Sequence, residues 1–194
     1  MITAQQIKEL REKTGAGISD VKKALEESGG DTDKAFKWIE HRLGGIAEKK
    51  SGRETKAGLV EAYIHSNGRI GAMLELFCET DFVARNPAFK GLAHDLAMHI
   101  AAMRPAYLSL ENMPQDLWQA EKGRFEEETR GLNKPSNVLK EIVAGKLKAH
   151  FGPLSLHEQP FVKDQDKTVG EVLNEAIGKF GENIKIGRFT RFEF

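Results

Sequence analysis

The sequence predicts an α+β fold, in which a small bundle of three helices precedes a core of antiparallel β-sheet with helices. Three short amphipathic segments separated by glycines occupy the first 45 residues. Farther along, Asn67-Gly68 separates two apolar runs, which is a strong short-range signal for a β-hairpin. Helical patterns follow this hairpin, so the second part is expected to combine sheet and helices in one core.

The N-terminal segment has the start and stop signals of three helices. Thr3 and Gln6 have the spacing of a capping box, which predicts a first helix from about Thr3 to Thr14. Ser19 can cap a second helix and Asp31 a third. The apolar residues at helical intervals are Ile7, Leu10, Val21, Ala24, Leu25, Ala35, Phe36 and Ile39. So small a bundle is marginally stable alone and is expected to serve as a docking module.

A change of composition follows Gly44-Gly45. The stretch from Lys49 to Lys56 is polar and charged and contains Ser51-Gly52, which is typical of a flexible linker. We therefore expect a three-helix bundle over residues 1–45, a linker over 46–57 and an α+β core over 58–194.

The hairpin is expected to have two apolar faces. A type I′ turn at Asn67-Gly68 pairs Ser66 with Arg69. One face then carries Val60, Ala62, Ile64, Met73 and Phe77, and the other carries Leu59, Tyr63, Ala72, Leu74, Leu76 and Cys78. Since a sheet with one wet face should alternate apolar and polar residues, helices are expected on one side and another cover, such as a second copy of the chain, on the other.

The remaining elements follow the same logic. Asn86-Pro87 starts a helix that ends before Pro105. Its apolar stripe is Phe89, Leu92, Ala93, Leu96, Ile100 and Met103. Further helices are predicted over 115–130, 136–150 and 168–180. The last twelve residues, 183–194, are rich in β-branched and aromatic residues and predict another strand.

Composition excludes several classes of function. Lys plus Arg is 29 and Asp plus Glu is 29, so no surplus of positive charge is available for nucleic acid and a protein partner is favoured. No apolar run approaches the roughly 20 residues that a membrane-spanning helix needs, and the N-terminus has no signal-peptide pattern. A cytoplasmic location is therefore expected, without membrane attachment.

The sequence also lacks the usual constellations of enzymes. His94 and His99 lie five residues apart, which is about 140° around a helix, so they do not share a metal-binding face. Cys78, the single cysteine, follows an apolar run, where burial would raise the pKa of its thiol and make it inert. Gly15-Ala16-Gly17 lacks the Lys-Ser/Thr of a phosphate-binding loop. No metal, cofactor or catalytic residue is predicted.

The segment after the second strand is the strongest functional signal. Thr80-Asp81-Phe82-Val83 places an acid beside a large aromatic residue in the connection to a helix. Burial of the Phe82 ring would be worth roughly 1.5 to 3 kcal/mol, so the ring either packs on its own core or contacts a partner.

The longer segment Thr80-Asp81-Phe82-Val83-Ala84-Arg85-Asn86 resembles the signature of the elongation factor Ts family. Other segments resemble the family in the same order: Leu10-Arg11-Glu12-Lys13-Thr14-Gly15-Ala16-Gly17, Lys22-Lys23-Ala24-Leu25 with Gly30-Asp31, Ala97-Met98-His99-Ile100-Ala101-Ala102, Glu158-Gln159-Pro160-Phe161-Val162-Lys163-Asp164 and Phe180-Gly181-Glu182-Asn183-Ile184. The likeness spans almost the whole chain.

This resemblance implies a ubiquitin-associated-type bundle and the GTPase elongation factor Tu as partner. It further implies a guanine nucleotide exchange factor of translation elongation and not an enzyme. The residues implied to bind the partner and dislocate its Mg²⁺ are Thr80, Asp81, Phe82 and Val83, and Leu10, Ile18 and His99 are implied as further contacts. For Leu10 the alternative is the core of the bundle, and for His99 it is an internal partner.

The chain departs from the family pattern in two places. Family members often carry methionines where this chain has Ile18-Ser19, which makes the expected contact apolar at Ile18 and less defined at Ser19. The chain also resembles the short form with one copy of the core subdomain, in which two chains pair through their sheets, so a homodimer is expected.

Two other classes of function stay open at this point. A docking protein could use the bundle to bind helices or ubiquitin-like folds without any effect on a nucleotide. A hydrolase could use Cys78 with His94 or His99, and thiol alkylation would then inactivate it.

Overall fold

The computed structural model describes residues 2–194 and confirms the α+β class. By their contacts these residues divide into two compact units. One unit comprises the residues up to Ala62 together with Met73–His94 and Glu171–Phe189, and the other comprises Tyr63–Ala72, Asp95–Gly170 and Thr190–Phe194. Several helices and strands contribute residues to both units.

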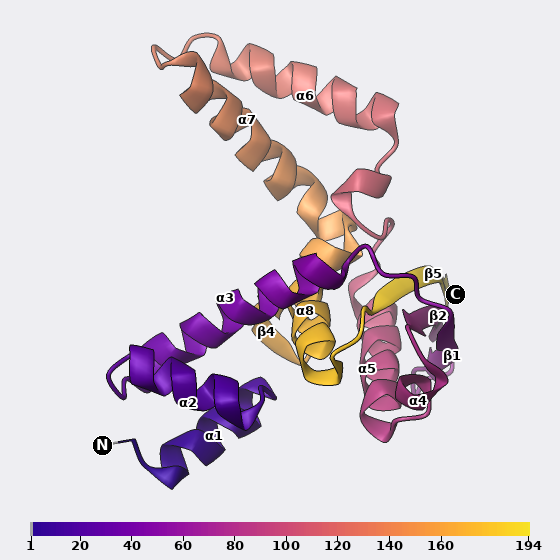
Figure 1. The fold of residues 1–194 in the computed structure, drawn as a ribbon. Coiled ribbons are helices and arrows are strands. Elements are labelled where there is room, and N and C mark those ends of the chain that lie inside the picture. Colours follow the sequence, from indigo (N-terminus) through magenta and orange to yellow (C-terminus); the bar gives the residue numbers. More distant parts are fainter. Residues whose placement is uncertain (1) are drawn as a thin grey trace. The chain divides into compact units, whose positions relative to one another are not determined.

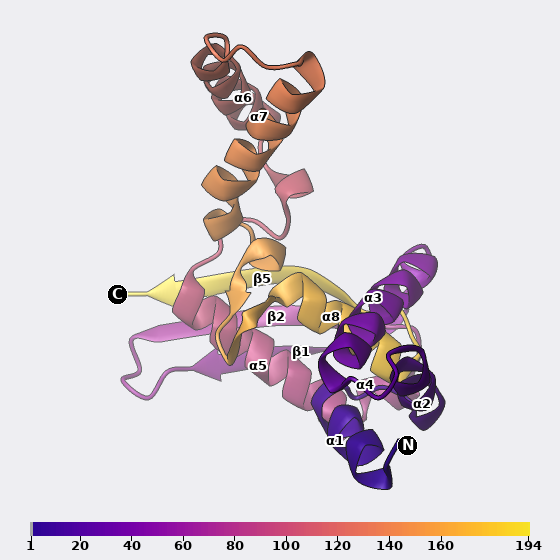
Figure 2. The same cartoon turned by 90° about the vertical axis from the view of Figure 1, so that its left-hand side faces the viewer.

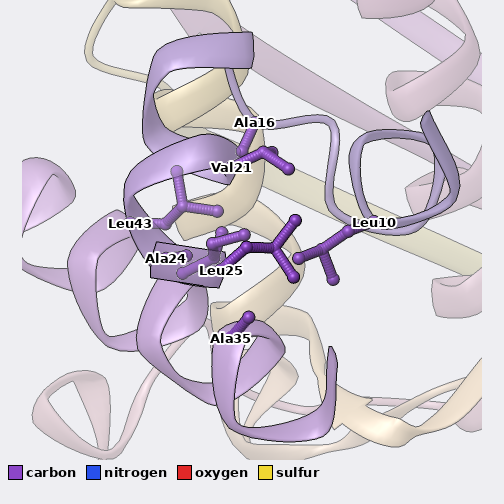
Figure 3. Packing of buried hydrophobic residues seen from close by; sticks show 8 residues of the cluster. Leu10, Ala16, Val21, Ala24, Leu25, Ala35 and Leu43 are labelled. Carbon is purple, nitrogen blue, oxygen red and sulfur yellow. The ribbon is translucent and has the colours of Figure 1, made fainter. Parts of the chain in front are cut away.

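The N-terminal bundle consists of α1 (Ala4–Thr14), α2 (Ile18–Glu27) and α3 (Thr32–Lys50). The capping box of Thr3 and Gln6 is confirmed, and Asp31 caps α3 by accepting from the backbone N–H groups of Asp33 and Lys34. Figure 3 shows side chains from all three helices meeting in its core, among them Leu10, Val21, Leu25 and Leu43. The predicted cap at Ser19 is wrong. Helix α2 already begins at Ile18, after Gly17, so Ser19 lies inside its first turn.

Helix α3 continues beyond the point expected from its glycines. It passes through Gly44 and Gly45 to Lys50, so residues 46–50 of the expected linker are helical. A glycine inside a helix costs about 1 kcal/mol relative to alanine, but Leu43 and Ala47 keep the helical spacing and are buried. Packing therefore offsets the low helix propensity. The domain limits at residues 45 and 57 stay predictions.

The main sheet contains β1 (Ala57–Ile64), β2 (Ile70–Cys78) and β5 (Lys185–Glu193) in the order β1-β2-β5, and Figure 2 shows them side by side. The predicted division of the apolar residues of the hairpin between two faces holds for those named next. Ala72, Leu74, Leu76 and Cys78 on β2 are buried, whereas Val60, Ala62, Ile64 and Met73 are exposed. The sheet thus keeps an uncovered apolar face.

The hairpin turn differs from the predicted type. Among the described non-glycine residues only Arg104 has a positive φ, so Asn67 does not adopt the left-handed conformation that a type I′ turn requires. Gly68 alone does, with φ 67°, and its N–H donates to the carbonyl of His65. Asn67 instead accepts a bond from the backbone N–H of Arg69 through its side chain. His65 still lies opposite Ile70, so the faces of the sheet are as expected.

The other helices match their predicted spans closely. They are α5 (Pro87–Met103), α6 (Gln115–Thr129), α7 (Ser136–Phe151) and α8 (Val169–Phe180). The short helix α4 (Asp81–Ala84), which precedes α5, was not predicted, because this segment was expected to be a connection. Figure 1 shows α6 and α7 as a helical hairpin, which has its own core around Phe125, Leu147 and Phe151. None of the helices described for residues 2–194 has both the length and the apolar character needed to cross a lipid bilayer.

Short elements between these helices were not predicted. They are the 3₁₀ turns η1 (Leu110–Asn112), η2 (Gly152–Leu154) and η3 (Leu156–Glu158), and a two-stranded sheet of β3 (Pro160–Phe161) and β4 (Asp164–Thr168). The β4 sequence Asp164-Gln165-Asp166-Lys167-Thr168 is polar throughout, so it has none of the apolar alternation by which a strand is found.

Candidate protein-binding site

The segment with the functional signature is a single helical turn at the end of β2. Helix α4 begins at Asp81, and the side chain of Thr80 caps it by accepting from the backbone N–H of Val83 at 3.5 Å. Val83 and Ala84 are buried beneath the turn. The same turn therefore anchors itself with two small apolar side chains and directs Asp81 and Phe82 outward.

Phe82 is 84% exposed, so the alternative that it packs on its own core is wrong. Burying its ring would be worth roughly 1.5 to 3 kcal/mol, which this chain leaves unused. Asp81 beside it is also exposed, and its carboxylate is 3.9 Å from the guanidinium of Arg85. An ion pair so open to water is weak, because solvent screens it. An exposed aromatic ring and an available carboxylate are thus presented together.

A carboxylate from another part of the chain holds the start of this turn. Glu182 accepts from the backbone N–H groups of Glu79 and Thr80, each at 3.0 Å, and from the Thr80 hydroxyl at 2.6 Å. In return, the Glu79 carboxylate accepts from the backbone N–H of Asn183 at 2.6 Å. The Asn183 side chain donates to the carbonyl of Arg53 at 2.7 Å.

Sequence reasoning missed these supporting residues. They come from three segments, which are the stretch after α3, the end of β2 and the turn between α8 and β5. The available signal was Glu182-Asn183, two polar residues at the junction of a predicted helix and a predicted strand. Nothing in the local pattern shows that they meet Glu79 and Thr80 more than a hundred residues earlier.

Leu10 and Ile18 differ in their accessibility. Leu10 is buried among the three helices of the bundle, which is the alternative stated for it above (Figure 3). Ile18, the first residue of α2, is 50% exposed. Of this pair, only Ile18 presents its side chain to a partner in the structure as it stands.

His99 on α5 is buried and has internal partners, which is the alternative stated for it above. Its Nδ1 accepts from the backbone N–H of Val162 at 3.1 Å, and its Nε2 is 2.9 Å from the side-chain oxygen of Gln159. The ring stacks on Phe161 with centroids 5.7 Å apart. Burial lowers the pKa of His99, which is therefore held neutral with a proton on Nε2.

The groups considered for catalysis do not form a reactive cluster. Cys78 is buried, and burial raises the pKa of its thiol, as predicted. His94 is paired with Glu61 at 3.3 Å and His99 with Gln159. Across residues 2–194, no three His, Cys, Asp or Glu side chains gather in a way that could hold a metal ion.

Comparison with known proteins supplies a family. A family model described as Elongation factor TS matches residues 18–194. The chain is 48% identical over 192 residues to elongation factor Ts of Thermotoga petrophila, which covers 99% of this chain and 96% of the relative. It is 49% identical over 192 residues to elongation factor Ts of Thermodesulfovibrio yellowstonii, with the same coverage. The protein of that name from Rubrobacter xylanophilus is 48% identical over 189 residues, 97% of each chain.

Proposed function

The chain belongs to the elongation factor Ts family, and from this premise we propose that it is a guanine nucleotide exchange factor that drives GDP off elongation factor Tu. The observation that carries the proposal is the exposure of Phe82 on a helical turn whose backbone is fixed by Glu182. An isolated exposed Phe is ordinary, but one held beside a solvent-exposed carboxylate on a supported turn is suited to enter a partner.

Asp81 and Phe82 act as a wedge in this proposal. In P-loop GTPases the Mg²⁺ ion bridges phosphate oxygens to ligands of the protein. When the wedge enters between helices of the partner's nucleotide domain, it displaces these ligands and weakens the hold on GDP. No bond of a substrate is made or broken, so the protein is not an enzyme in the usual sense.

Thermodynamic linkage makes the effect reversible. If this protein weakens GDP binding by a given factor, GDP weakens binding of this protein by the same factor. Nucleotide and exchange factor therefore displace one another, and GTP completes the cycle. Shifting a site from 99:1 to 1:99 needs about 5.5 kcal/mol of differential binding. A buried Phe supplies only roughly 1.5 to 3 kcal/mol, so further contacts are required.

The bundle is the proposed source of these contacts. Ile18 is exposed and offers an apolar side chain to elongation factor Tu. Leu10 of the bundle and His99 of α5 were also expected to contact the partner, but both side chains are buried in this chain. Their direct contact with the partner stays a prediction. The neutral formal charge of the chain is in keeping with a protein partner and not with nucleic acid. For a factor of translation, the cytoplasm stays the expected location.

A second copy of this chain is the proposed cover of the open sheet face. Val60 is 62% exposed and Ile64 is 68% exposed, and both lie on the same side of β1. Met73 on β2 is exposed as well. Burial of apolar side chains is favourable in proportion to the area removed from water. A strand face that repeats such side chains is therefore more stable in an interface than exposed to water.

Nucleotide release tests the exchange activity directly. Elongation factor Tu loaded with a fluorescent GDP is mixed with excess unlabelled GDP and with increasing amounts of this protein. The wild type is expected to accelerate release, and the double variant Asp81→Ala Phe82→Ala to do so at least about tenfold less, because most of the wedge contact is lost. Release at the wild-type rate by the folded double variant would sink the proposal.

A matched control separates the wedge from general exposure of aromatic rings. Phe194 is also a highly exposed phenylalanine, and Phe194→Ala is expected to keep the wild-type exchange rate. Both variants should keep the wild-type melting temperature, since neither ring packs in a core. If the protein were a docking module without exchange activity, the amount of partner recovered in a pull-down would not fall as the GDP concentration rises.

A further inference from the structure

The backbone that leads into α4 is anchored by one side chain from far along the sequence. Glu182, between α8 and β5, accepts all three of its bonds from Glu79 and Thr80, which precede it by 103 and 102 residues. One oxygen, Oε2, receives both backbone N–H groups, and the other, Oε1, receives the Thr80 hydroxyl. These are charge-assisted bonds, which are stronger than those between neutral groups.

The anchor is reciprocal. While Glu182 holds the backbone of Glu79, the Glu79 carboxylate holds the backbone N–H of Asn183 next to Glu182. Arg53 lies 3.6 Å from the other oxygen of Glu79 and offers its carbonyl to the Asn183 side chain. Each segment thus limits the motion of the other, so the start of α4 is positioned from outside the helix.

Helix α4 depends on such support because it is very short. It spans four residues, and the backbone bonds that close it run from Ala84 to Thr80 and from Arg85 to Asp81. Nucleating one helical turn is unfavourable in water, since several dihedral angles are fixed for one or two hydrogen bonds. The external bonds to Thr80 offset this cost.

The Thr80 hydroxyl transmits the anchor into the helix. The Thr80 hydroxyl donates a hydrogen bond to Glu182. The oxygen of the same hydroxyl accepts a hydrogen bond from the backbone N–H of Val83. Asp81 and Phe82 lie between these two points. Because the Phe82 ring has almost no cover from its own chain, its direction is set by this backbone and not by packing.

We propose that Glu182 is a positioning residue for exchange, which holds α4 in the conformation in which Asp81 and Phe82 enter the partner. A preformed wedge loses less conformational entropy on binding than a mobile one. This inference rests on the proposed exchange function. It differs from a purely structural role, in which Glu182 would stabilise the fold without affecting how the wedge acts once bound.

The first measurement uses this protein alone. Amide hydrogen exchange is followed for Glu182→Ala, Glu182→Gln and Glu128→Ala. Glu128 lies in the other unit and pairs with Lys146, so its variant removes a carboxylate that is bonded elsewhere in the protein. Glu182→Ala is expected to raise the amide hydrogen exchange rates of residues 79–83 about tenfold, which is the size expected when bonds to a charged acceptor are lost. Glu128→Ala is expected to leave these rates unchanged.

The second measurement separates positioning from affinity. GDP release from elongation factor Tu is recorded against the concentration of each variant, which gives a maximal rate and a half-saturating concentration. Glu182→Ala is expected to lower the maximal rate about tenfold while the half-saturating concentration changes less than about threefold, because the bundle still docks. Glu182→Gln should lie in between, since its amide keeps one oxygen for the backbone N–H groups.

The outcomes are distinguishable. If the wild type does not accelerate release, the proposed function falls and this inference falls with it. If the wild type is active and Glu182→Ala is equally active at saturation, only the inference is overturned. If Glu182 had a purely structural role, Glu182→Ala would show faster amide hydrogen exchange throughout the first unit and an unchanged maximal rate of GDP release. That result would also overturn the inference. Should Glu182→Ala not fold, Glu182→Gln is judged by the same criteria.

Discussion

His99 shows how a single buried residue links the fold to pH. Its Nδ1 accepts the backbone N–H of Val162, so protonation of Nδ1 would break this bond and place a charge in the core. Burial lowers the pKa of His99, and it also lowers that of His157. In the unfolded chain both imidazoles titrate near their ordinary value of about 6.5.

We therefore predict that the protein loses stability as the pH falls below about 6.5. The folded pKa values are depressed, so the stabilisation is fully present above the unfolded pKa and disappears as the pH falls toward the folded values. Each of the two histidines contributes a slope of at most about 1.4 kcal/mol per pH unit. Urea unfolding at about pH 7.5 and about pH 5.5 measures this difference.

Two variants assign the effect to its source. His99→Gln is expected to reduce the pH dependence by about half, because His157 remains. His41 lies exposed on α3, and His41→Gln makes the same substitution there as the matched control. An unchanged slope in His99→Gln would mean that His99 is not the titrating group.

At the level of elements, two glycines occupy opposite situations. Gly58 on β1 has φ 156°, and a Cβ there would lie 2.4 Å from the carbonyl oxygen of Leu76 on the paired strand. Backbone cannot yield as a side chain can. For Gly44 inside α3, a Cβ would meet no atom within 4 Å apart from the neighbouring backbone of its own helix. The same substitution should thus have effects of opposite sign at these positions.

We predict that Gly58→Ala destabilises the fold by about 1 to 3 kcal/mol, as overpacking against a fixed neighbour does. Gly44→Ala is expected to stabilise it by up to about 1 kcal/mol, because alanine is the better helix former. Urea unfolding of both variants under one set of conditions tests the pair. A destabilised Gly44→Ala would show that α3 is not continuous through Gly44 and Gly45.

The elements that could be predicted are those whose signals are local. The cap at Thr3, the cap at Asp31 and the alternation along β2 depend on residues a few positions apart, and all three are present. Strand β4 and the end of α3 could not be predicted, because long-range packing overrode local composition. Two glycines do not end a helix when Leu43 and Ala47 are buried.

The candidate site likewise contains residues that could be identified from the sequence and a residue that could not. Asp81 and Phe82 were identified from a contiguous segment that resembles the elongation factor Ts family, and the exposure of Phe82 agrees with a contact role. Glu182 could not be identified, since its partners lie more than a hundred residues away. The anchor of a site is a property of the tertiary structure, whereas its signature is a property of the sequence.

For the whole molecule, the oligomeric state depends on what covers the apolar face of the sheet. Val60 and Ile64 on β1 and Met73 on β2 are exposed, although strands of a sheet with one wet face normally carry polar residues there. If a second copy covers this face, a charge introduced into it would be buried without a partner. Such burial is strongly unfavourable, so association should be lost while the fold remains.

We predict that the wild type is a dimer at micromolar concentration and that Ile64→Glu is a monomer, as measured by light scattering. Leu132, between α6 and α7, is also exposed, and Leu132→Glu adds the same charge away from the sheet and should stay dimeric. Both variants should keep wild-type melting behaviour except for the concentration dependence that dissociation removes. A wild type with the mass of one chain would eliminate pairing through the sheet, and the apolar face would then require another partner.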